Sequence, residues 1–305
     1  MLNKNTISRL NKQKFYLLVL LVYVAFIGIF AYYPMYGMLL AFKEYSFKSG
    51  IISSPWVGFK WFKMFFTSPD FFQVLRNTLA MSAMDLIFGF PAPILFALLL
   101  NEIRNIKFKR VVQSVSYLPH FISWIVVVGI AMSVLSIDGG FINDLLLKLG
   151  FVDKPIHFLG RQNMFWWIIT ILGIWKGTGW NSIIYLSAIT SIDVQMYESA
   201  QIEGANKLQQ VLYITLPSIA PTIIMLFVFR LGYILNVGFE QQLFLQNPMN
   251  YRVAEVIDTY VFKMGIRRSM FSYATAVGMF KSIIGLFLVL LANKFTRKTL
   301  DMGVF

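Results

Sequence analysis

Long uncharged runs of apolar residues alternate with polar segments along this chain. A helix needs roughly 20 apolar residues to cross a bilayer, and we predict a membrane span at each of six runs: 15–42, 77–101, 111–137, 165–190, 218–237 and 271–293. Prolines at 91, 93 and 119 are expected to bend the second and third spans. The pattern therefore predicts an all-α membrane protein with six transmembrane helices and both termini on one side.

Two of the polar segments between the runs predict short helices of their own. Between 43 and 76, phenylalanines recur at helical spacing beside lysines and tryptophans, which is typical of a helix lying in the membrane interface. Leucines and isoleucine from 142 to 149 trace a short amphipathic helix that Gly150 is expected to end.

The segment between the fourth and fifth runs carries helix signals at both of its ends. Asp193 suits an N-cap, Glu198 and Glu203 suit the early part of a helix because of its dipole, and Gly204 can adopt the positive φ that ends one. A second helix is expected over 206–217, since proline fits a first helical turn. Four apolar positions in this segment imply a surface for a partner: Met196, Ala200, Ile202 and Leu208. The alternative is an amphipathic loop that rests on the bilayer.

The composition supports a membrane protein and excludes several kinds of site. Of 305 residues, 57% are hydrophobic and only 13% are charged, about half the charged share of a soluble domain. The absence of cysteine excludes disulfides, thiol nucleophiles and Cys-ligated metals. His120 and His157 are too few for a His-rich metal site and are interpreted as interface residues. Without a GxxxxGK[ST] stretch, any ATP hydrolysis must occur on another chain.

The basic residues favour one orientation in the membrane. Much of the net charge of +13 flanks apolar runs, which suits anchoring to anionic headgroups. The first run is too long for a signal peptide and lacks a small-residue cleavage site, so it is taken as uncleaved. If the N-terminus is cytoplasmic, the cytoplasmic segments hold about 12 Lys and Arg in roughly 60 residues, and the external segments hold a similar number in roughly 110. The higher density of basic residues on the cytoplasmic side favours this orientation.

Four charged residues lie within the predicted spans: Asp85, Lys176, Arg230 and Lys281. Each costs about 2.5 to 3.5 kcal/mol near a helix centre in hydrocarbon, so they should face protein or water. Asp85 is expected either to pair with one of the three bases or to line a cavity with them.

Polar and aromatic residues on the fourth and fifth spans suggest a sugar site. Residues 175–181 combine tryptophans, a lysine, an asparagine and glycines; ring faces suit the apolar face of a sugar, and the polar groups suit its hydroxyls. The glycines permit either kinking or close helix packing. Tyr233, Asn236 and Glu240 lie three and four apart, hence on one predicted helical stripe, with the latter two near the outer mouth.

The polar loop resembles a known family motif. Glu198-Ser199-Ala200, then Gly204, then nine residues to Ile214-Thr215-Leu216-Pro217, is similar to the E-A-A, three residues, G, nine residues, I-x-L-P loop of permease subunits in binding-protein-dependent ABC importers. Ser199 stands where the family usually has a second alanine. The resemblance implies a type I ABC importer permease fold and a cytoplasmic loop whose helix docks in a separate ATPase. The ATPase-coupling residues it implies are Asp193, Tyr197, Glu198, Ala200, Gly204 and Ala205.

A second resemblance concerns the substrate. Residues 238–265, Trp175-Lys176-Gly177 and 274–281 are similar to permeases of the oligosaccharide and polysaccharide branch of the maltose-type carbohydrate importers. In those permeases the sugar is held by the spans before and after the ATPase loop. The resemblance and the sugar-site chemistry together give the substrate-binding candidates Lys176, Gly177, Trp180, Tyr233, Asn236 and Glu240.

These observations together predict the transmembrane permease subunit of an ATP-driven glycan importer in the bacterial plasma (inner) membrane. The expected parts are a cytoplasmic tail over 1–14, a permease domain over 15–293 containing the 193–217 coupling loop, and a cytoplasmic tail over 294–305. The expected partners are a second homologous permease, an ABC ATPase dimer that holds ATP and Mg²⁺, and an extracellular solute-binding protein. This chain itself should be no enzyme and hold no cofactor or metal.

Three other classes of membrane protein are alternatives. An ATP-independent transporter or channel would be supported by an internal inverted repeat, which the sequence does not display. A membrane-embedded enzyme would want His, Asp and Glu clustered at one membrane depth, whereas acids inside the predicted spans are nearly absent. Exporter permeases usually lack the loop motif.

Overall fold

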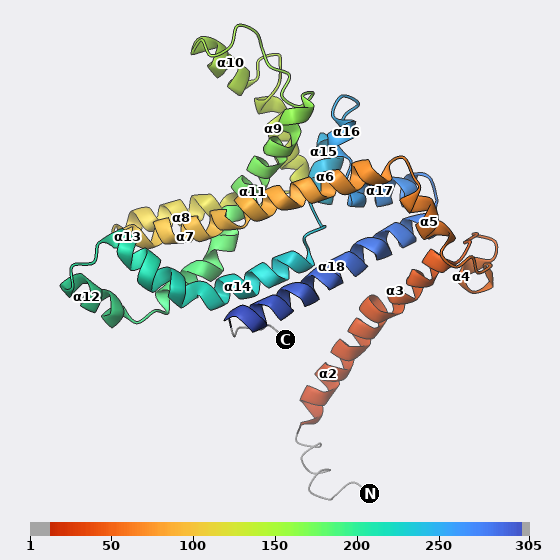
Figure 1. Ribbon diagram of the computed structural model, residues 1–305, viewed down its shortest axis with the longest axis horizontal. Helices are drawn as coiled ribbons and strands as arrows, with labels where there is room; N and C mark the ends of the chain where they lie inside the picture. The colour runs from red at the N-terminus through yellow and green to blue at the C-terminus, as the bar shows by residue number, and fades with distance from the viewer. Residues whose placement is uncertain (1–12, 301–305) are drawn as a thin grey trace, which may run out of the picture. The chain divides into compact units, whose positions relative to one another are not determined.

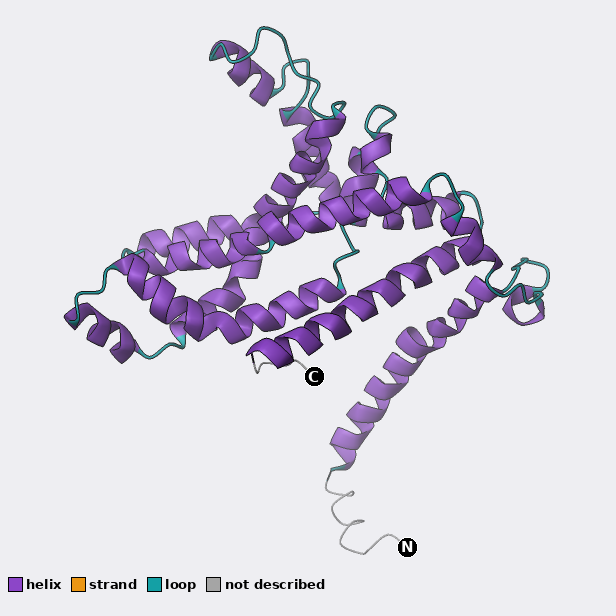
Figure 2. Cartoon of the chain, in the orientation of Figure 1, coloured by secondary structure: helices purple, strands orange, loops and turns teal. Residues whose placement is uncertain are grey.

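The computed structural model describes residues 13–300 (Figure 1). The predicted tail over 1–14 therefore lies almost entirely outside the described residues, as does the end of the predicted tail over 294–305. Throughout the described range the secondary structure is helical, and the only β-type pairing found there is an isolated bridge between Lys43 and Trp56 (Figure 2). The all-α prediction is confirmed.

The described residues divide into two compact units, of which the first comprises residues 13–67 and 263–279. Its helices are α2 (Lys14–Ile27), η1 (Gly28–Tyr32), α3 (Tyr33–Met35), η2 (Tyr36–Phe42), α4 (Gly50–Ser53), α5 (Lys60–Phe66), η5 (Lys263–Arg267) and the start of α18 (Phe271–Leu300). Helical structure from 14 to 42 agrees with the first predicted span, and α5 agrees with the predicted helix rich in aromatics and lysines.

Aromatic packing forms the centre of this first unit. Phe65 and Tyr273 are both buried, with ring centroids 6.4 Å apart, and Trp61 lies edge-on to the same tyrosine. The N–H of Tyr45 donates to Oγ of Ser272 at 3.1 Å. These contacts fasten the segment after the first apolar run to the start of α18.

Of the described residues, the second unit comprises 68–262 and 280–300. Its helices, besides the rest of α18, are α6 (Phe71–Met84), η3 (Asp85–Gly89), α7 (Pro91–Glu102), α8 (Ile106–Phe121), α9 (Trp124–Val134), α10 (Phe141–Lys148), α11 (Gln162–Thr190), α12 (Val194–Ile202), α13 (Lys207–Gln210), η4 (Val211–Thr215), α14 (Leu216–Gly232), α15 (Phe239–Leu245), α16 (Tyr251–Ala254) and α17 (Ile257–Phe262). Helix α10 ends as predicted, with Gly150 at φ +71° just beyond it.

Helix α11 is the central element of the second unit, and it packs against α7, α8 and α14. Near the polar loop the core is formed by α7, α11 and α14 through Ile94, Tyr185 and Ile219. At the other end of α11 a separate core surrounds Phe165 and Ile169. The polar stretch predicted to meet substrate lies on α11 between these two cores.

The helices of this unit depart from regular geometry near two of the predicted prolines. Pro91 has no N–H for the carbonyl four residues earlier, and the preceding turn η3 is a π-helix in which the N–H of Phe90 bonds to the Asp85 carbonyl at 2.7 Å. Helices α8 and α9 meet at a bend of 103°. The bend predicted in the third span is therefore present, although it falls at 122–123 rather than at Pro119 itself. In the second span the departure from regular geometry is the π-helical turn η3, within one continuous helical stretch over 71–102.

By length and composition, four helical stretches of the described residues can cross a membrane: 14–42, 71–102, 207–232 and 271–294. The bent pair α8 and α9 makes a fifth if it is one span. Helix α11 has 29 residues, long enough to cross, but polar residues at its centre keep it out of this group. Six spans remain a prediction.

Candidate functional site

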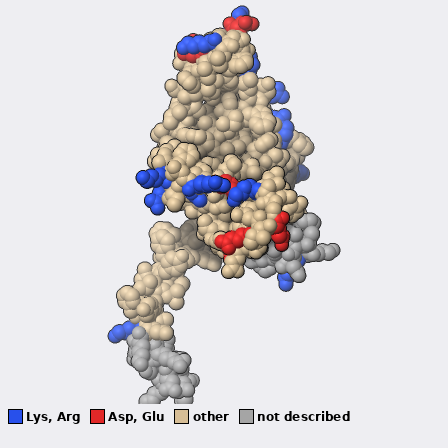
Figure 3. All heavy atoms as spheres, turned by 90° about the vertical axis from the view of Figure 1, so that its left-hand side faces the viewer, with Lys and Arg blue, Asp and Glu red and all other residues tan. Residues whose placement is uncertain are grey.

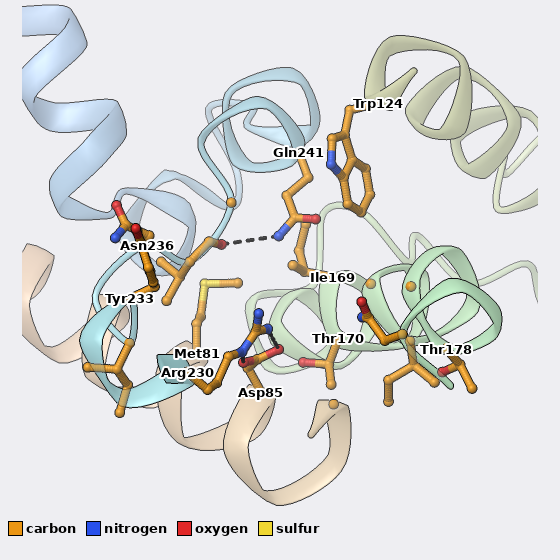
Figure 4. A pocket seen from close by; sticks show the side chains of 18 residues that line it. Met81, Asp85, Trp124, Ile169, Thr170, Thr178, Arg230, Tyr233, Asn236 and Gln241 are labelled. Carbon is orange, nitrogen blue, oxygen red and sulfur yellow. Dashed lines mark hydrogen bonds and ion pairs between the residues drawn. The ribbon is translucent and has the colours of Figure 1, made fainter. Parts of the chain in front are cut away.

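A cavity of about 220 Å³ opens beside the middle of α11 (Figure 4). It is lined by the π-helical turn η3, the start of α9, the end of α14 and the segment that links α14 to α15. The lining mixes charged, amide, hydroxyl and aromatic side chains with the backbone of small residues. Such a lining suits a polar ligand that also has an apolar face.

The charged groups in the cavity form an ion pair. Arg230, in the last turn of α14, donates from Nε to Oδ2 of Asp85 at 2.7 Å and from Nη2 to Oδ1 at 2.5 Å. Both side chains are partly exposed, and Figure 4 shows them facing each other at one wall. Asp85 does pair with one of the three bases, as one alternative predicted, and the pair also lines the cavity, as the other did.

Lys281, the basic residue within the last predicted span, pairs with a different acid. Nζ of Lys281, on α18, forms an ion pair with Asp258 at the start of α17 and donates to Oδ1 of Asn236. Asn236 lines the cavity. The amide predicted to meet substrate is thus held in place by a lysine from the last long helix.

The predicted stripe of Tyr233, Asn236 and Glu240 is wrong. Helix α14 ends at Gly232, and Gly238 adopts a left-handed φ of +88° before α15 begins at Phe239. Tyr233 and Asn236 lie in the intervening turn and line the cavity, whereas Glu240 is exposed on α15. Helical spacing does not order side chains beyond the end of a helix.

Lys176 and Trp180 face α8 and lie outside the cavity lining. The Trp180 indole stacks on the His120 imidazole, with centroids 4.6 Å apart and 7° between the planes. Nζ of Lys176 donates to three backbone carbonyls at the end of α8. Gly177 does line the cavity. A Cβ at Gly179 would overlap the Ser116 carbonyl, so this glycine serves close helix packing, one of its two predicted roles.

Among the cavity residues that the sequence does not predict are Trp124 and Gln241. Trp124 begins α9, and Gln241 lies on α15 with its Nε2 donating to the Val237 carbonyl at 3.1 Å (Figure 4). Oε1 of Gln241 is buried and has no hydrogen-bond partner among the described residues. Neither position carries a local signal, because its place in the cavity depends on how three separate segments meet. Over the described residues, no group of three or more His, Asp and Glu side chains is placed to hold a metal.

The loop after α11 has the predicted form of helix, turn and helix. Oδ1 of Asp193 accepts from the N–H of Gln195 at 3.0 Å and caps α12, and Gly204 ends that helix with φ +84°. Asn206 then caps α13, which runs without a break through η4 into α14. Glu203 is the exception, since it lies at the C-terminal cap of α12 and not early in a helix.

This loop exposes apolar side chains at one end of the second unit. Ile202 is 89% exposed and Leu208 67%, far more than an apolar side chain in a packed helix pair. Glu198 and Gly204 are also exposed, and Ala200 and Ala205 are half-buried. Figure 3 shows the corresponding face, where basic side chains form a band with acidic side chains to one side. The exposed surface suits a protein partner with apolar and charged contacts.

Comparison with known proteins places the chain among transport proteins. The family model described as "Binding-protein-dependent transport system inner membrane component" matches residues 89–301. Protein LplB of Bacillus subtilis (strain 168) is 44% identical over 298 residues, 98% of this chain and 93% of that protein. The polygalacturonan/rhamnogalacturonan transport system permease protein YteP of the same organism is 43% identical over 302 residues, which cover 99% of this chain and 94% of that protein.

A solved structure extends the likeness to three dimensions. One chain of a bacterial ABC transporter involved in the import of the acidic polysaccharide alginate superposes with a TM-score of 0.89. It is 39% identical, over 97% of this chain and 99% of that one. The same likeness holds for the alginate transporter in complex with an alginate pentasaccharide-bound periplasmic protein.

Proposed function

Because this chain belongs to the family of binding-protein-dependent transport system inner membrane components, we propose that it is a permease subunit of an ATP-driven importer of oligosaccharides or polysaccharides. The observation that carries the proposal is the likeness over 97% of the chain to a subunit of an alginate importer. The name of YteP, a polygalacturonan/rhamnogalacturonan permease, supports a multi-unit glycan as cargo.

The delivery route follows from the same relatives. The alginate importer was solved with a periplasmic protein that carries a pentasaccharide. We therefore expect a solute-binding protein to bring the glycan to the outer face of this chain. A second homologous permease, which the family motif in the loop implies, would complete the path.

The exposed loop from 193 to 217 is the proposed contact with a separate ATPase that holds ATP and Mg²⁺. Its apolar residues Ile202 and Leu208 and its acidic Glu198 offer contacts to a groove of that partner. The residues proposed for coupling remain Asp193, Tyr197, Glu198, Ala200, Gly204 and Ala205. Because α13, η4 and α14 are one continuous helical stretch, a displacement of the loop would move the cavity wall that carries Arg230.

The cavity beside α11 is the proposed glycan site within this chain. Gly177, Tyr233 and Asn236 line it directly, and Lys176, Trp180 and Glu240 would act on it from outside the lining. The subunit performs no covalent chemistry. ATP-driven closure of the ATPase would favour the outward-open state and hydrolysis the inward-open state, so that binding energy is converted into directed transport.

The domain limits and the orientation belong to the same proposal. The permease domain would extend over 15–293, with both termini cytoplasmic in the bacterial plasma membrane. The loop from 193 to 217 would then also be cytoplasmic, as contact with an ATPase requires.

The decisive experiment changes the loop surface while sparing the cavity. Replacing Glu198 by Lys together with Gly204 by Trp reverses a charge and forces a side chain onto a φ of +84°, which only glycine adopts readily. We expect the ATPase to be lost on co-purification and ATP-dependent glycan uptake to fall by at least tenfold. The control is Lys154→Glu, a charge reversal at an exposed residue between α10 and α11.

Retention of the ATPase and of uptake by the loop double variant would contradict the proposed contact. Glycan flux through this chain alone, without any ATPase, would instead support the alternative of an ATP-independent transporter or channel.

A further inference from the structure

The break between α8 and α9 leaves backbone carbonyls in need of donors. Ile122 and Ser123 are both extended, with ψ values of 132° and 152°, and the helix axis turns by 103° across them. In a continuous helix the carbonyl of His120 would accept from the N–H of Trp124. The extended residues remove that donor. The Pro119 carbonyl still accepts from the N–H of Ile122 at 3.2 Å, so the carbonyls of His120 and Ile122 are the ones that need another donor.

Lys176 of α11 supplies those partners. Its Nζ donates to the carbonyls of Pro119 at 3.2 Å, His120 at 2.6 Å and Ile122 at 2.6 Å. A protonated lysine has three N–H donors, and all three are used here. The positive charge also lies at the negative end of the α8 dipole. The ammonium group thus has the geometry of a helix cap provided by a neighbouring helix.

The same ammonium group lies beside the first residue after the break. Nζ of Lys176 is 5.6 Å from the centroid of the Trp124 ring, within the range of a cation–π contact. Trp124 lines the cavity, whereas Lys176 does not. One side chain therefore fixes both the bend and the aromatic ring that the bend brings to the cavity.

We propose that Lys176 is a positioning residue that holds the α8–α9 break, and that Trp124, so placed, packs against a sugar ring of the transported glycan. This inference rests on the proposed function. It assigns to Trp124 the stacking role that the sequence suggested for Trp180, whose ring instead stacks on His120. It also removes Lys176 from direct contact with substrate, because its donors are occupied.

The surroundings of Trp124 suit a sugar ring. Figure 4 shows Trp124 and Gln241 next to each other at one edge of the cavity. An indole face covers the apolar C–H face of a pyranose. The buried Oε1 of Gln241, which has no partner among the described residues, would accept a hydrogen bond from a glycan hydroxyl.

The positioning role can be tested without knowing the substrate. The chain contains no cysteine, so cysteines introduced at Val111 on α8 and Met132 on α9, both exposed, can be spin-labelled specifically in the full chain. In the otherwise unchanged protein we expect one narrow distance distribution. Lys176→Met removes the three donors while keeping much of the side-chain volume, and we expect the distribution to broaden or shift. Lys281→Met, which loses an ion pair elsewhere, should leave it unchanged.

The substrate role needs transport measurements on the assembled complex in proteoliposomes. The probe is whichever of trigalacturonate, alginate pentasaccharide and arabinotriose the unmodified complex takes up fastest. We expect Trp124→Ala and Lys176→Met each to raise KM about tenfold, and the double variant to raise it no further than either single change. Trp124→Phe should recover most of the loss.

The outcomes separate the two levels of inference. An unchanged distance distribution in Lys176→Met would overturn the positioning role, whatever is transported. Independent, multiplicative effects of Lys176→Met and Trp124→Ala on KM would make Lys176 a direct ligand. Normal KM in Trp124→Ala would overturn the stacking role. Failure of the unmodified complex to take up any glycan would contradict the proposed function and leave the spin-label result to decide the role of Lys176.

Discussion

The hydroxyl of Tyr197, on the loop helix α12, lies 2.9 Å from Oγ1 of Thr215, the last residue of the π-helix η4. Thr215 is buried, and its hydroxyl in turn donates to the Gln210 carbonyl at 3.4 Å. Nε2 of Gln210 donates to the Ala205 carbonyl at 3.1 Å. This chain of hydrogen bonds joins α12, the turn after it and the start of the continuous helix into one body.

We therefore predict that Tyr197 transmits loop movement and does not itself hold the ATPase. Tyr197→Phe removes the hydroxyl but keeps the ring, so the ATPase should still co-purify while glycan transported per ATP hydrolysed falls several-fold. Thr215→Val should behave in the same way. Tyr213→Phe is the matched control, because Tyr213 is 77% exposed on the same stretch. Loss of the ATPase from Tyr197→Phe would show that the hydroxyl belongs to the docking surface.

The Asp85–Arg230 pair provides a second prediction, on stability. Arg230→Gln leaves the partly exposed Asp85 carboxylate in the cavity without its cation. We expect this change to lower the free energy of unfolding by about 1 kcal/mol. The double variant Asp85→Asn with Arg230→Gln should recover part of that loss. Thermal unfolding of the detergent-solubilised chain measures both variants. If the loss in the double variant equals the sum of the losses in Asp85→Asn alone and Arg230→Gln alone, the pair contributes nothing to stability.

Two glycines of α11 provide a matched pair. Gly179→Ala would place a methyl group on the Ser116 carbonyl of α8, and we expect a loss of about 1 to 3 kcal/mol from overpacking. Gly173→Ala meets nothing within 4 Å, so the higher helix propensity of alanine should leave stability unchanged or raised. Thermal unfolding in detergent again decides. Equal stability of the two variants would contradict the close packing of α11 on α8.

The orientation is predicted by the positive-inside rule and can be checked with single cysteines. Ser199→Cys, on the exposed loop helix, should react with an impermeant maleimide only from the cytoplasmic side of membrane vesicles. Lys154→Cys, on the exposed segment between α10 and α11, should react only from the opposite side. Labelling of both cysteines from one side would place the two segments on the same side of the membrane and exclude the proposed topology.

The sequence alone was enough to predict those features that depend on neighbouring residues. The caps of the loop helices follow from Asp193 and Gly204, because capping requires only a local acceptor and a residue that tolerates positive φ. The helical runs follow from the length of their apolar stretches. The π-helical turn before Pro91 follows from the missing N–H of that proline, which disturbs the turn next to it.

Only the tertiary structure decided which distant groups meet. Asp85 and Arg230 are 145 residues apart, and nothing local distinguishes Arg230 from Lys176 or Lys281 as the partner. The same holds for Lys176 capping α8 and for Trp124 entering the cavity. The stripe of Tyr233, Asn236 and Glu240 failed because α14 ends at Gly232 and α15 begins only at Phe239, and periodicity orders side chains only while a helix continues. Contacts between segments depend on the packing of whole helices, which single-residue patterns do not encode.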